Sequence, residues 1–494
     1  GWPDLYFTQG GIWKSGEEAS ALAEQFTDRL FRNQEGLRFL DVTVYSGIEM
    51  FDFGQGLAVG DVNSDGFDDI YVCNIGKNRL WLNNGDGTFS QAHSPFEHAF
   101  EDWTTSAVIA DINGDGFSDL YEVNYVTGEG VYTLICNGRG CSPSVFQGTP
   151  NRGWLNDGTG RFLLVQKSDG KQSDSKSLGV VAMRLHDEAK TAIFISNDQV
   201  PNFLMVPHFD DGVFEMEDQA LLRGVALNAD GLSMGCMGVA VDDLDANGTL
   251  DLLVTNFSNE SNSLYSQDRT GLFSDMSLGF GIHQPSYPLV GWGAQFLDAD
   301  RDGYPDLVIA NGNVDDYRDI GGEYQMLPQF YRNSGGSRFE LITSSEIGDF
   351  FSKKFSGRGL ARLDWNRDGR MDFVVSNIDS PASLVTNQTS AAGNFLNVRL
   401  IGIQSERHPV GARLTLNSGR QQFFKHVTAG DGYQSSNEKV IQFGLGQVHS
   451  LMELEVEWPS GIVTTYPNPP CNREIWCVEG DNRFYEREMS QRTE

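Results

Sequence analysis

The stretch 298–306 of this 494-residue chain carries carboxylates at a spacing that suits a metal cation. They occupy positions 1, 3, 5 and 9 of a nine-residue loop: Asp298, Asp300, Asp302 and Asp306. Gly303 at position 6 allows a sharp turn, and oxygen ligands without nitrogen or sulfur are typical of a Ca2+ site. An EF-hand would add a glutamate at position 12 and continue as a helix. Here position 12 is Ile309, inside an apolar run, so the loop joins two strands.

The same loop recurs four more times with the same offsets. We expect ligands at positions 1, 3, 5 and 9 and, through the main-chain carbonyl, at position 7. These residues are Asp61, Asn63, Asp65, Phe67 and Asp69; Asp111, Asn113, Asp115, Phe117 and Asp119; Asp243, Asp245, Asn247, Thr249 and Asp251; Asp298, Asp300, Asp302, Tyr304 and Asp306; and Asp364, Asn366, Asp368, Arg370 and Asp372. The repeats predict about five or six structural Ca2+ ions per chain.

Two degenerate copies extend the pattern to seven. Segment 184–192 keeps the flanking strand patterns but has Arg, His and Ala at positions 1, 3 and 9. We expect it to have lost its cation, with the charge of Arg184 in the ion's place. The N-terminal Gly-Trp-Pro-Asp4 aligns with residues 303–306, so the chain shown starts within a loop, with Asp4 as the ligand at position 9. We therefore expect the natural protein to extend upstream of this point.

A second recurring element lies between the loops. Apolar residues, an Asn/Gly turn and a second strand pattern form hairpin signatures at 80–89 and 154–162, with variants at 30–39 and 330–339. Each repeat thus offers about four strands, and seven such units predict an all-β, seven-bladed β-propeller over residues 1–390, with a truncated first blade. The best candidate for an α-helix in the sequence is the segment 16–32.

From Asn394 onward the pattern changes to alternating strands without cation loops. We predict a separate antiparallel β domain over residues 391–480, followed by a polar tail over 481–494.

The formal net charge of −32 argues against nucleic acid and anionic membrane surfaces as partners, since both select for basic patches. Bound cations would neutralise part of this charge. No run of about 18 apolar residues is present, so the sequence predicts no membrane span.

The chain has six cysteines, and two pairs of them have a spacing that suggests disulfides and hence an oxidising compartment. Cys136 and Cys141 share a Gly-rich loop, and Cys471 and Cys477 follow a Pro-rich turn, so each pair is predicted to form a local disulfide. Free thiols are the alternative. Cys73 and Cys236 lie in apolar strand patterns that predict buried, inert side chains.

These motifs resemble a known family. The D-x-[DN]-x-[DN]-G-x-x-D loops with N-x-G-x-G-x-F hairpins resemble the FG-GAP/VCBS repeats of integrin-α-type propellers. Gly411-Ala-Arg-Leu, Phe443-Gly-Leu-Gly and Trp458-Pro-Ser-Gly are similar to motifs of the ASPIC/UnbV domain. The combination resembles the cartilage acidic protein-like family and its bacterial relatives, and implies a secreted, calcium-binding propeller with a β cap.

Two chemical roles can be weighed for the loops. Clustered carboxylates also serve glycosidases and two-metal hydrolases, but catalysis needs one distinctive site, whereas these loops are near-identical repeats.

His93 and His98, near Glu97, Glu101 and Asp102, are a candidate transition-metal site, with ordinary surface histidines as the alternative. Three aromatic residues could line a ligand-binding face or belong to the core: Trp103, Tyr287 and Trp292.

The sequence therefore favours a secreted or periplasmic calcium-binding propeller that acts as an interaction scaffold for a protein or glycan, alone or as a subunit of a larger assembly. The alternative is an enzyme or biosynthetic accessory with a transition-metal site on a propeller face. The partner is not encoded in any recognisable motif.

Overall fold

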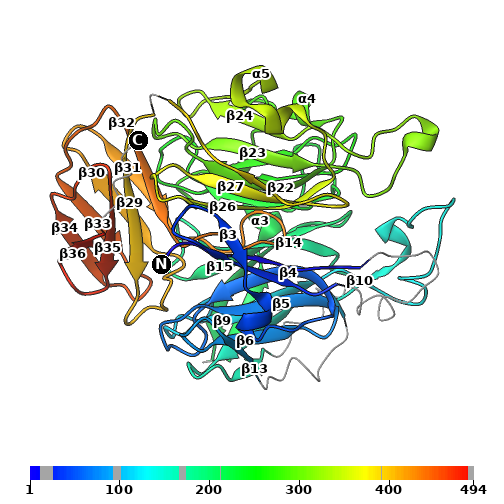
Figure 1. The fold of residues 1–494 in the computed structure, drawn as a ribbon, viewed down its shortest axis with the longest axis horizontal. Coiled ribbons are helices and arrows are strands. Elements are labelled where there is room, and N and C mark those ends of the chain that lie inside the picture. Colours follow the sequence, from blue (N-terminus) through cyan, green and yellow to red (C-terminus); the bar gives the residue numbers. More distant parts are fainter. Residues whose placement is uncertain (12–25, 93–101, 166–173, 212, 391, 488–494) are drawn as a thin grey trace.

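The computed structural model describes residues 1–494 except 12–25, 93–101, 166–173, 212, 391 and 488–494. Its regular structure is almost entirely β-strand (Figure 1). The described helices are single turns on the connections: α1 (Thr43–Ser46), η2 (Pro143–Val145), α3 (Ala220–Arg223), α4 (His283–Ser286), η3 (Arg318–Ile320), α5 (Ser344–Ile347) and η4 (Asp349–Ser352).

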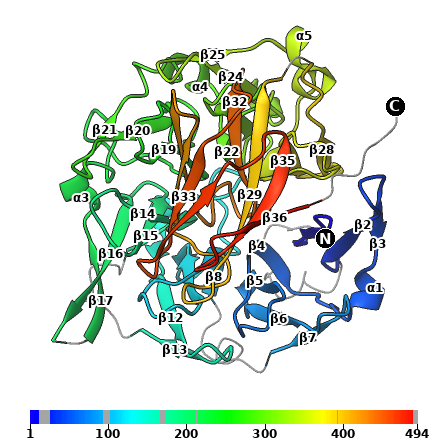
Figure 2. The same cartoon turned by 90° about the vertical axis from the view of Figure 1, so that its left-hand side faces the viewer.

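The described strands up to residue 385 form seven consecutive antiparallel units around a common axis (Figure 2). The first three units are β1 (Leu5–Phe7), β2 (Arg29–Asn33) and β3 (Phe39–Asp41); β4 (Phe53–Gly60), β5 (Asp69–Gly76), β6 (Arg79–Asn83) and β7 (Phe89–Gln91); and β8 (Asp102–Ala110), β9 (Asp119–Asn124), β12 (Arg152–Asn156) and β13 (Phe162–Leu164). Pairing of β5 with β8 joins the second and third units into one eight-stranded sheet.

Four further units complete the ring. They are β14 (Ser177–Arg184), β15 (Thr191–Asn197), β16 (Phe203–Asp210) and β17 (Val213–Asp218); β18 (Val239–Asp242), β19 (Asp251–Val254), β20 (Ser263–Gln267) and β21 (Phe273–Asp275); β22 (Gly291–Leu297), β23 (Asp306–Asn311), β24 (Gln329–Asn333) and β25 (Phe339–Leu341); and β26 (Gly357–Leu363), β27 (Asp372–Asn377) and β28 (Ser383–Val385). A short pair, β10 (Val126–Thr127) with β11 (Gln147–Gly148), branches from the connection between β9 and β12.

The ring arises because each sheet is apolar on both faces. Every residue of β9, β15, β19 and β23 is buried, since each sheet packs between two neighbours. Apolar clusters therefore lie between adjacent sheets, as where Phe194 of β15 meets Val241 of β18. This architecture confirms the predicted all-β propeller.

The C-terminal domain packs two four-stranded sheets face to face. One contains β29 (Asn394–Ile401), β32 (Ile441–Gly446), β35 (Arg473–Val478) and β36 (Phe484–Glu486), and the other β30 (Arg413–Asn417), β31 (Gln422–His426), β33 (Glu453–Glu457) and β34 (Val463–Pro467). Leu396, Leu416, Trp458 and Tyr466 are fully buried between the sheets. The domain covers one end of the propeller (Figures 1 and 2).

Three expectations about local structure need correction. β29 and β35 run parallel, because the long intervening chain forms the second sheet and returns in the same direction. Residues 484–486, assigned to a polar tail, form β36 and pair with β35. Residues 29–32, the end of the predicted helix, lie in β2, since pairing on both sides overrides the local pattern. Residues 16–25 of that helix lie outside the described residues.

Candidate metal-binding loops

The five complete loops, called the cation loops below, all connect the first and second strands of a unit. They lie between β4 and β5, β8 and β9, β18 and β19, β22 and β23, and β26 and β27. Because consecutive strands are antiparallel, all five emerge at the same end of the propeller. This is the end that carries the C-terminal domain (Figure 1).

Within each cation loop, the aspartates at positions 1 and 9 are buried, and in two of the loops three carboxylates form a close cluster. Carboxylate oxygens of Asp243, Asp245 and Asp251 lie within 4.8 Å of one another, as do those of the corresponding residues in the loop 298–306: Asp298, Asp300 and Asp306. These acidic clusters could hold a metal ion. Their donors are all oxygen, which is the donor set of a hard cation.

The carboxylates also organise the loop by accepting main-chain hydrogen bonds. The two oxygens of Asp306 accept from the N–H of Ala299 at 3.1 Å and of Asn333 at 2.9 Å. Those of Asp298 accept from the N–H of Asp302 at 3.0 Å and of Gly303 at 2.8 Å. The other four loops repeat these bonds, which explains why position 9 is always aspartate.

Positions 3, 5 and 7 lie nearer the loop tip. Asn63, Asn113 and Asn366 donate from their side-chain amides to the carboxylate at position 5, Asp65, Asp115 and Asp368. The N–H of position 7 donates to the position 5 side chain in all five loops: Phe67, Phe117, Thr249, Tyr304 and Arg370. The structure therefore brings all predicted ligand positions of each complete loop into one turn.

A left-handed residue at position 4 is a feature that the sequence did not reveal. Ser64, Ala246, Arg301 and Arg367 have φ of 58°, 59°, 58° and 55°, and Gly114 occupies the fifth copy. L-residues rarely adopt this conformation, so the carboxylate bonds around it must hold the backbone in place. The only available signal was the glycine found there in one of the five copies.

Burial of these acids has an electrostatic consequence. It raises the pKa of Asp69 and Asp251 to about 7 and that of Asp119 and Asp372 to about 8, and neighbouring loop carboxylates add to the shift. A bound cation would reverse this effect, because opposite charge favours the ionised form.

The two degenerate positions differ from each other. Asp4 accepts a hydrogen bond from the N–H of Asn33 at 2.7 Å, the equivalent of the Asp306–Asn333 bond, so it occupies position 9 of the first unit. Arg184 donates to the carbonyl of Glu188 at 3.0 Å, across the turn, and pairs with Glu457 of the C-terminal domain at 2.6 Å. Its guanidinium thus ties the loop to the neighbouring domain.

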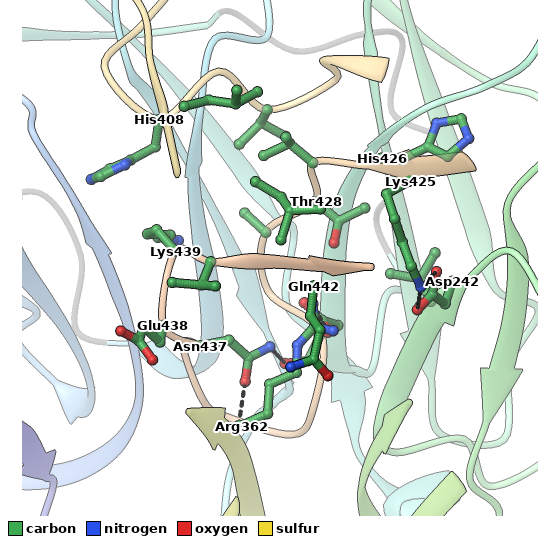
Figure 3. A pocket seen from close by; sticks show the side chains of 18 of the residues that line it. Asp242, Arg362, His408, Lys425, His426, Thr428, Asn437, Glu438, Lys439 and Gln442 are labelled. Atoms are coloured by element: carbon green, nitrogen blue, oxygen red, sulfur yellow. Dashed lines mark hydrogen bonds and ion pairs between the residues drawn. The ribbon is translucent and has the colours of Figure 1, made fainter. Parts of the chain in front are cut away.

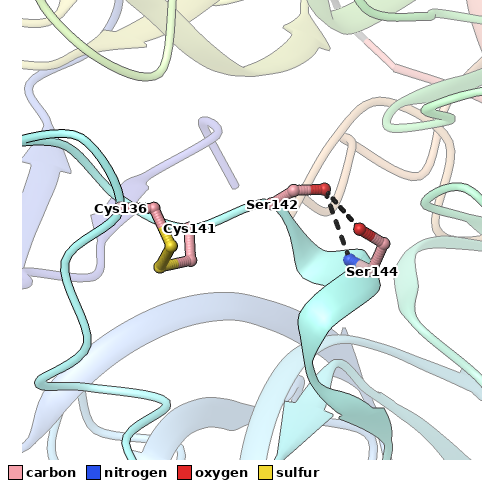
Figure 4. The surroundings of a disulfide bond; sticks show 4 residues. All are labelled: Cys136, Cys141, Ser142 and Ser144. Carbon is pink, nitrogen blue, oxygen red and sulfur yellow. Dashed lines mark hydrogen bonds between the residues drawn. A yellow bond between two sulfur atoms is a disulfide. The ribbon is translucent and has the colours of Figure 1, made fainter.

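Cys136 and Cys141 form the predicted disulfide (Figure 4). Their loop belongs to the connection that carries β10, at the end of the propeller opposite the C-terminal domain (Figure 1). The predicted bond between Cys471 and Cys477 is wrong, because both are free. β35 runs extended from Arg473 to Val478, so Cys477 lies inside the domain core near the far end of the strand, while Cys471 precedes the strand and packs against the edge of the same core. Cys73 and Cys236 are buried, as predicted.

The candidate transition-metal site at His93 and His98 cannot be placed in the structure, whereas the three aromatic residues considered for a ligand-binding face can. His93, Glu97, His98 and Glu101 lie outside the described residues, and none of the acidic clusters found among the described residues contains a histidine. Trp292 belongs to the core, where it donates to the carbonyl of Gly312 at 2.7 Å. Trp103 packs edge-on against Tyr125, and only Tyr287 is largely exposed.

The propeller axis is occupied by residues 428–437 of the C-terminal domain, called the axial segment. Ala429 forms a β-bridge with Ala182 of β14, and Gly432 forms one with Val239 of β18. The carbonyl of Asp431 accepts from Gln295 at 2.8 Å. The central position of the propeller is therefore filled by the chain itself.

A cavity of about 60 Å³ remains between the two domains (Figure 3). In it, Lys425 pairs with both carboxylate oxygens of Asp242, at 2.7 and 2.9 Å. Its walls also include Arg362, His426 and Gln442, each with a buried polar atom that has no hydrogen-bond partner among the described residues. Its size suits a few ordered waters and is far below the roughly 300–1,000 Å³ of typical ligand sites.

Comparisons with known proteins agree with this architecture. The FG-GAP-like repeat model matches residues 61–122, 243–309 and 298–375, and the ASPIC and UnbV model matches residues 402–483. The chain combines FG-GAP-like repeats with an ASPIC and UnbV domain. The FG-GAP-like matches include all five cation loops.

Cartilage acidic protein 1 of Homo sapiens is 25% identical over 425 residues, which cover 82% of this chain and 60% of that protein. The Xenopus tropicalis protein is 24% identical, over 58% of this chain and 42% of its own length. The chain thus spans 60% or less of these relatives.

Among solved structures, a lectin of Agrocybe aegerita that recognises terminal N-acetylglucosamine is 15% identical, with a TM-score of 0.44, over 78% of this chain and 90% of its own. The Dos1 propeller is 10% identical, with a TM-score of 0.37, over 90% of this chain and 95% of its own.

Proposed function

We propose that this protein is a calcium-binding interaction scaffold of an oxidising, extracytoplasmic compartment. Five all-oxygen loops with the spacing of a Ca2+ site support calcium as the ion, and about five ions per chain are expected. The disulfide between Cys136 and Cys141 supports the compartment. Within the described residues, no helix has the length and apolar character needed to cross a membrane.

The observation that carries the scaffold proposal is the difference between the two ends of the propeller. The cation-loop end is covered by the C-terminal domain and the axis is filled, so a partner must bind elsewhere. The opposite end, called the long-loop face, carries the connections 125–151 and 312–328 (Figure 1).

The long-loop face has the properties of an interaction surface. Its two connections meet where Arg139 pairs with Asp319 and stacks on Tyr317 at 4.7 Å. On these two connections, large apolar side chains are exposed by 45–68%: Leu134, Ile135, Val145, Val314 and Ile320. Apolar side chains gathered on stapled loops are typical of a binding surface for protein or glycan. The net charge of −32 disfavours nucleic acid.

The proposal is tested by affinity purification from the native source with two immobilised proteins, the natural chain and the Leu134→Ser/Ile320→Ser variant. A partner retained by the natural chain and lost by the variant is expected. Retention by both proteins would place the binding surface elsewhere. Leu163→Ser, which alters an exposed leucine of β13, serves as the matched control.

Elemental analysis of the purified protein tests the metal. Calcium at about five ions per chain is expected from the number of complete loops. Stoichiometric copper, iron or zinc instead would favour the enzyme alternative over the scaffold.

A further inference from the structure

The C-terminal domain rests directly on the cation loops. In the loop 61–69, Asp68 bonds to His408 at 2.5 Å. In the loop 111–119, Ser118 donates to Glu406 at 2.8 Å. In the loop 243–251, the carbonyl of Gly248 lies 3.3 Å from the ring nitrogen of His426. Each complete loop contacts this domain, so the segments that would bind the ions form a large part of the surface that holds the domain, together with the degenerate loop 184–192 and the strands around the axial segment.

The loop 298–306 makes closer contacts. Its carbonyls at Asp300 and Arg301 accept main-chain hydrogen bonds from Gly393 and Gly446, both at 2.7 Å. A side chain at Gly444 would collide with the carboxylate of Asp298, so β32 closely approaches the expected ligand.

Buried ion pairs hold the loop 364–372 against the C-terminal domain. Arg367 pairs with Glu438 at 2.7 Å and with Glu474 at 3.3 Å, and all three side chains are at most 7% exposed. The N–H of Asp364 donates to Glu438 at 2.9 Å. Glu438 thus binds both the loop backbone and the guanidinium that projects from it.

The direction of that guanidinium depends on the loop conformation. Arg301 and Arg367 occupy position 4, where φ is 58° and 55°. The left-handed backbone aims both side chains at the C-terminal domain: Arg301 stacks on Phe395 at 4.3 Å, and Arg367 reaches the buried glutamates. A loop that relaxed from this conformation would withdraw both contacts, because an L-residue prefers negative φ.

We infer that the cation loops are a metal-dependent seat for the C-terminal domain, in which the bound ion fixes the carboxylates whose main-chain hydrogen bonds hold Arg301 and Arg367 in the left-handed conformation that anchors the domain. The inference rests on the calcium binding of the proposed function and goes beyond it, because it links ion occupancy to the attachment of one domain to the other. Removal of the cation is expected to free the C-terminal domain and its axial segment before the propeller unfolds.

Hydrogen exchange of the full chain, with calcium and after chelation, tests the link. It is measured by mass spectrometry well below the temperature of unfolding. We expect chelation to raise exchange in residues 428–446 and 473–478 by about tenfold, more than in β15 and β16, which adjoin no complete cation loop. Exchange that rises equally in both regions, or only within the loops, would overturn the inference.

A matched pair of variants separates the anchor from the ion. Arg367→Gly and Ser64→Gly both place glycine at a left-handed position 4, and Ser64 is exposed and makes no contact with the C-terminal domain among the hydrogen bonds and ion pairs of the described residues. With calcium present, Arg367→Gly should raise exchange in residues 436–440 and 473–478 by about tenfold, while Ser64→Gly should leave it unchanged. Equal behaviour of the two variants would refute the anchoring role of Arg367.

Calcium content measured on the same samples distinguishes the two proposals. If the purified chain binds no calcium, the proposed function fails. If it binds about five ions and chelation leaves the C-terminal domain as protected as before, only the metal-dependent seat fails. Retention of full calcium content by Arg367→Gly is expected, because the side chain at position 4 contributes no ligand.

Discussion

The loops 61–69 and 364–372 have the same local structure and different surroundings. Both hold position 4 left-handed and bond the N–H of Gly66 or Gly369 to the first aspartate at 2.8 Å. Ser64 is nevertheless exposed, whereas Arg367 is 7% exposed beneath the C-terminal domain. The loop motif therefore determines the conformation of each loop, and the covering domain determines which contacts between the domains depend on that conformation.

Chelation should have the largest effect, since it acts on every loop at once. Five sites that each contribute about 1 kcal/mol at extracellular calcium would shift the melting temperature of the propeller by roughly 5–10 °C. Differential scanning calorimetry with calcium and with EDTA measures this shift. An unchanged melting temperature would contradict structural calcium binding, and magnesium in place of calcium is the control for ion size.

Substitution of the first aspartate in each loop directly tests the contrast between the two. Asp61→Asn and Asp364→Asn should each remove about one ion. Asp364→Asn should lower the free energy of unfolding by roughly 2–4 kcal/mol and Asp61→Asn by about half as much, because only the former disturbs the buried Arg367–Glu438 contact. Urea denaturation with matched calcium checks both values. Equal losses would mean that the covering domain adds nothing to the loop.

Acid should destabilise the packing of the C-terminal domain against the loop 243–251, because it charges His426. Burial lowers the pKa of His426 to about 4, so the folded state favours the neutral ring. The stability that this supplies is complete above the unfolded pKa of about 6.5 and is lost as the pH falls toward 4. Between pH 7 and 4, the natural chain should lose roughly 2–3 kcal/mol more than His426→Gln, which does not titrate. Parallel pH profiles of the two proteins would exclude this role.

The disulfide on the long-loop face should have the smallest global effect. Cys136→Ser/Cys141→Ser removes a disulfide between residues five positions apart, in an exposed connection whose side chains make few contacts with the core. We expect a change in melting temperature below about 1 °C and faster proteolysis confined to residues 125–151. A large loss of stability would show that this face, and not only the cation-loop end, supports the fold.

Repeats were the part of the fold most accessible from sequence. The spacing of Asp61 and Asp69, found again four times, predicted where strands meet, because backbone N–H groups and a cation need oxygens at those places. The failed disulfide between Cys471 and Cys477 shows the limit: closeness along the chain is not closeness in space once a strand extends between the residues. The parallel pairing of β29 with β35 was hidden for a related reason, since alternation reveals burial but not strand direction.

By itself, the sequence determined the loop chemistry, the strand–loop–strand repeat and the existence of a second β domain, because all three depend on local spacing and periodicity. Only the tertiary structure decided that the second domain sits on the loops, that residues 428–437 fill the axis and that Arg367 finds Glu438 and Glu474. Those contacts join residues more than 70 positions apart. They follow from how two folded domains fit together, which no local pattern records.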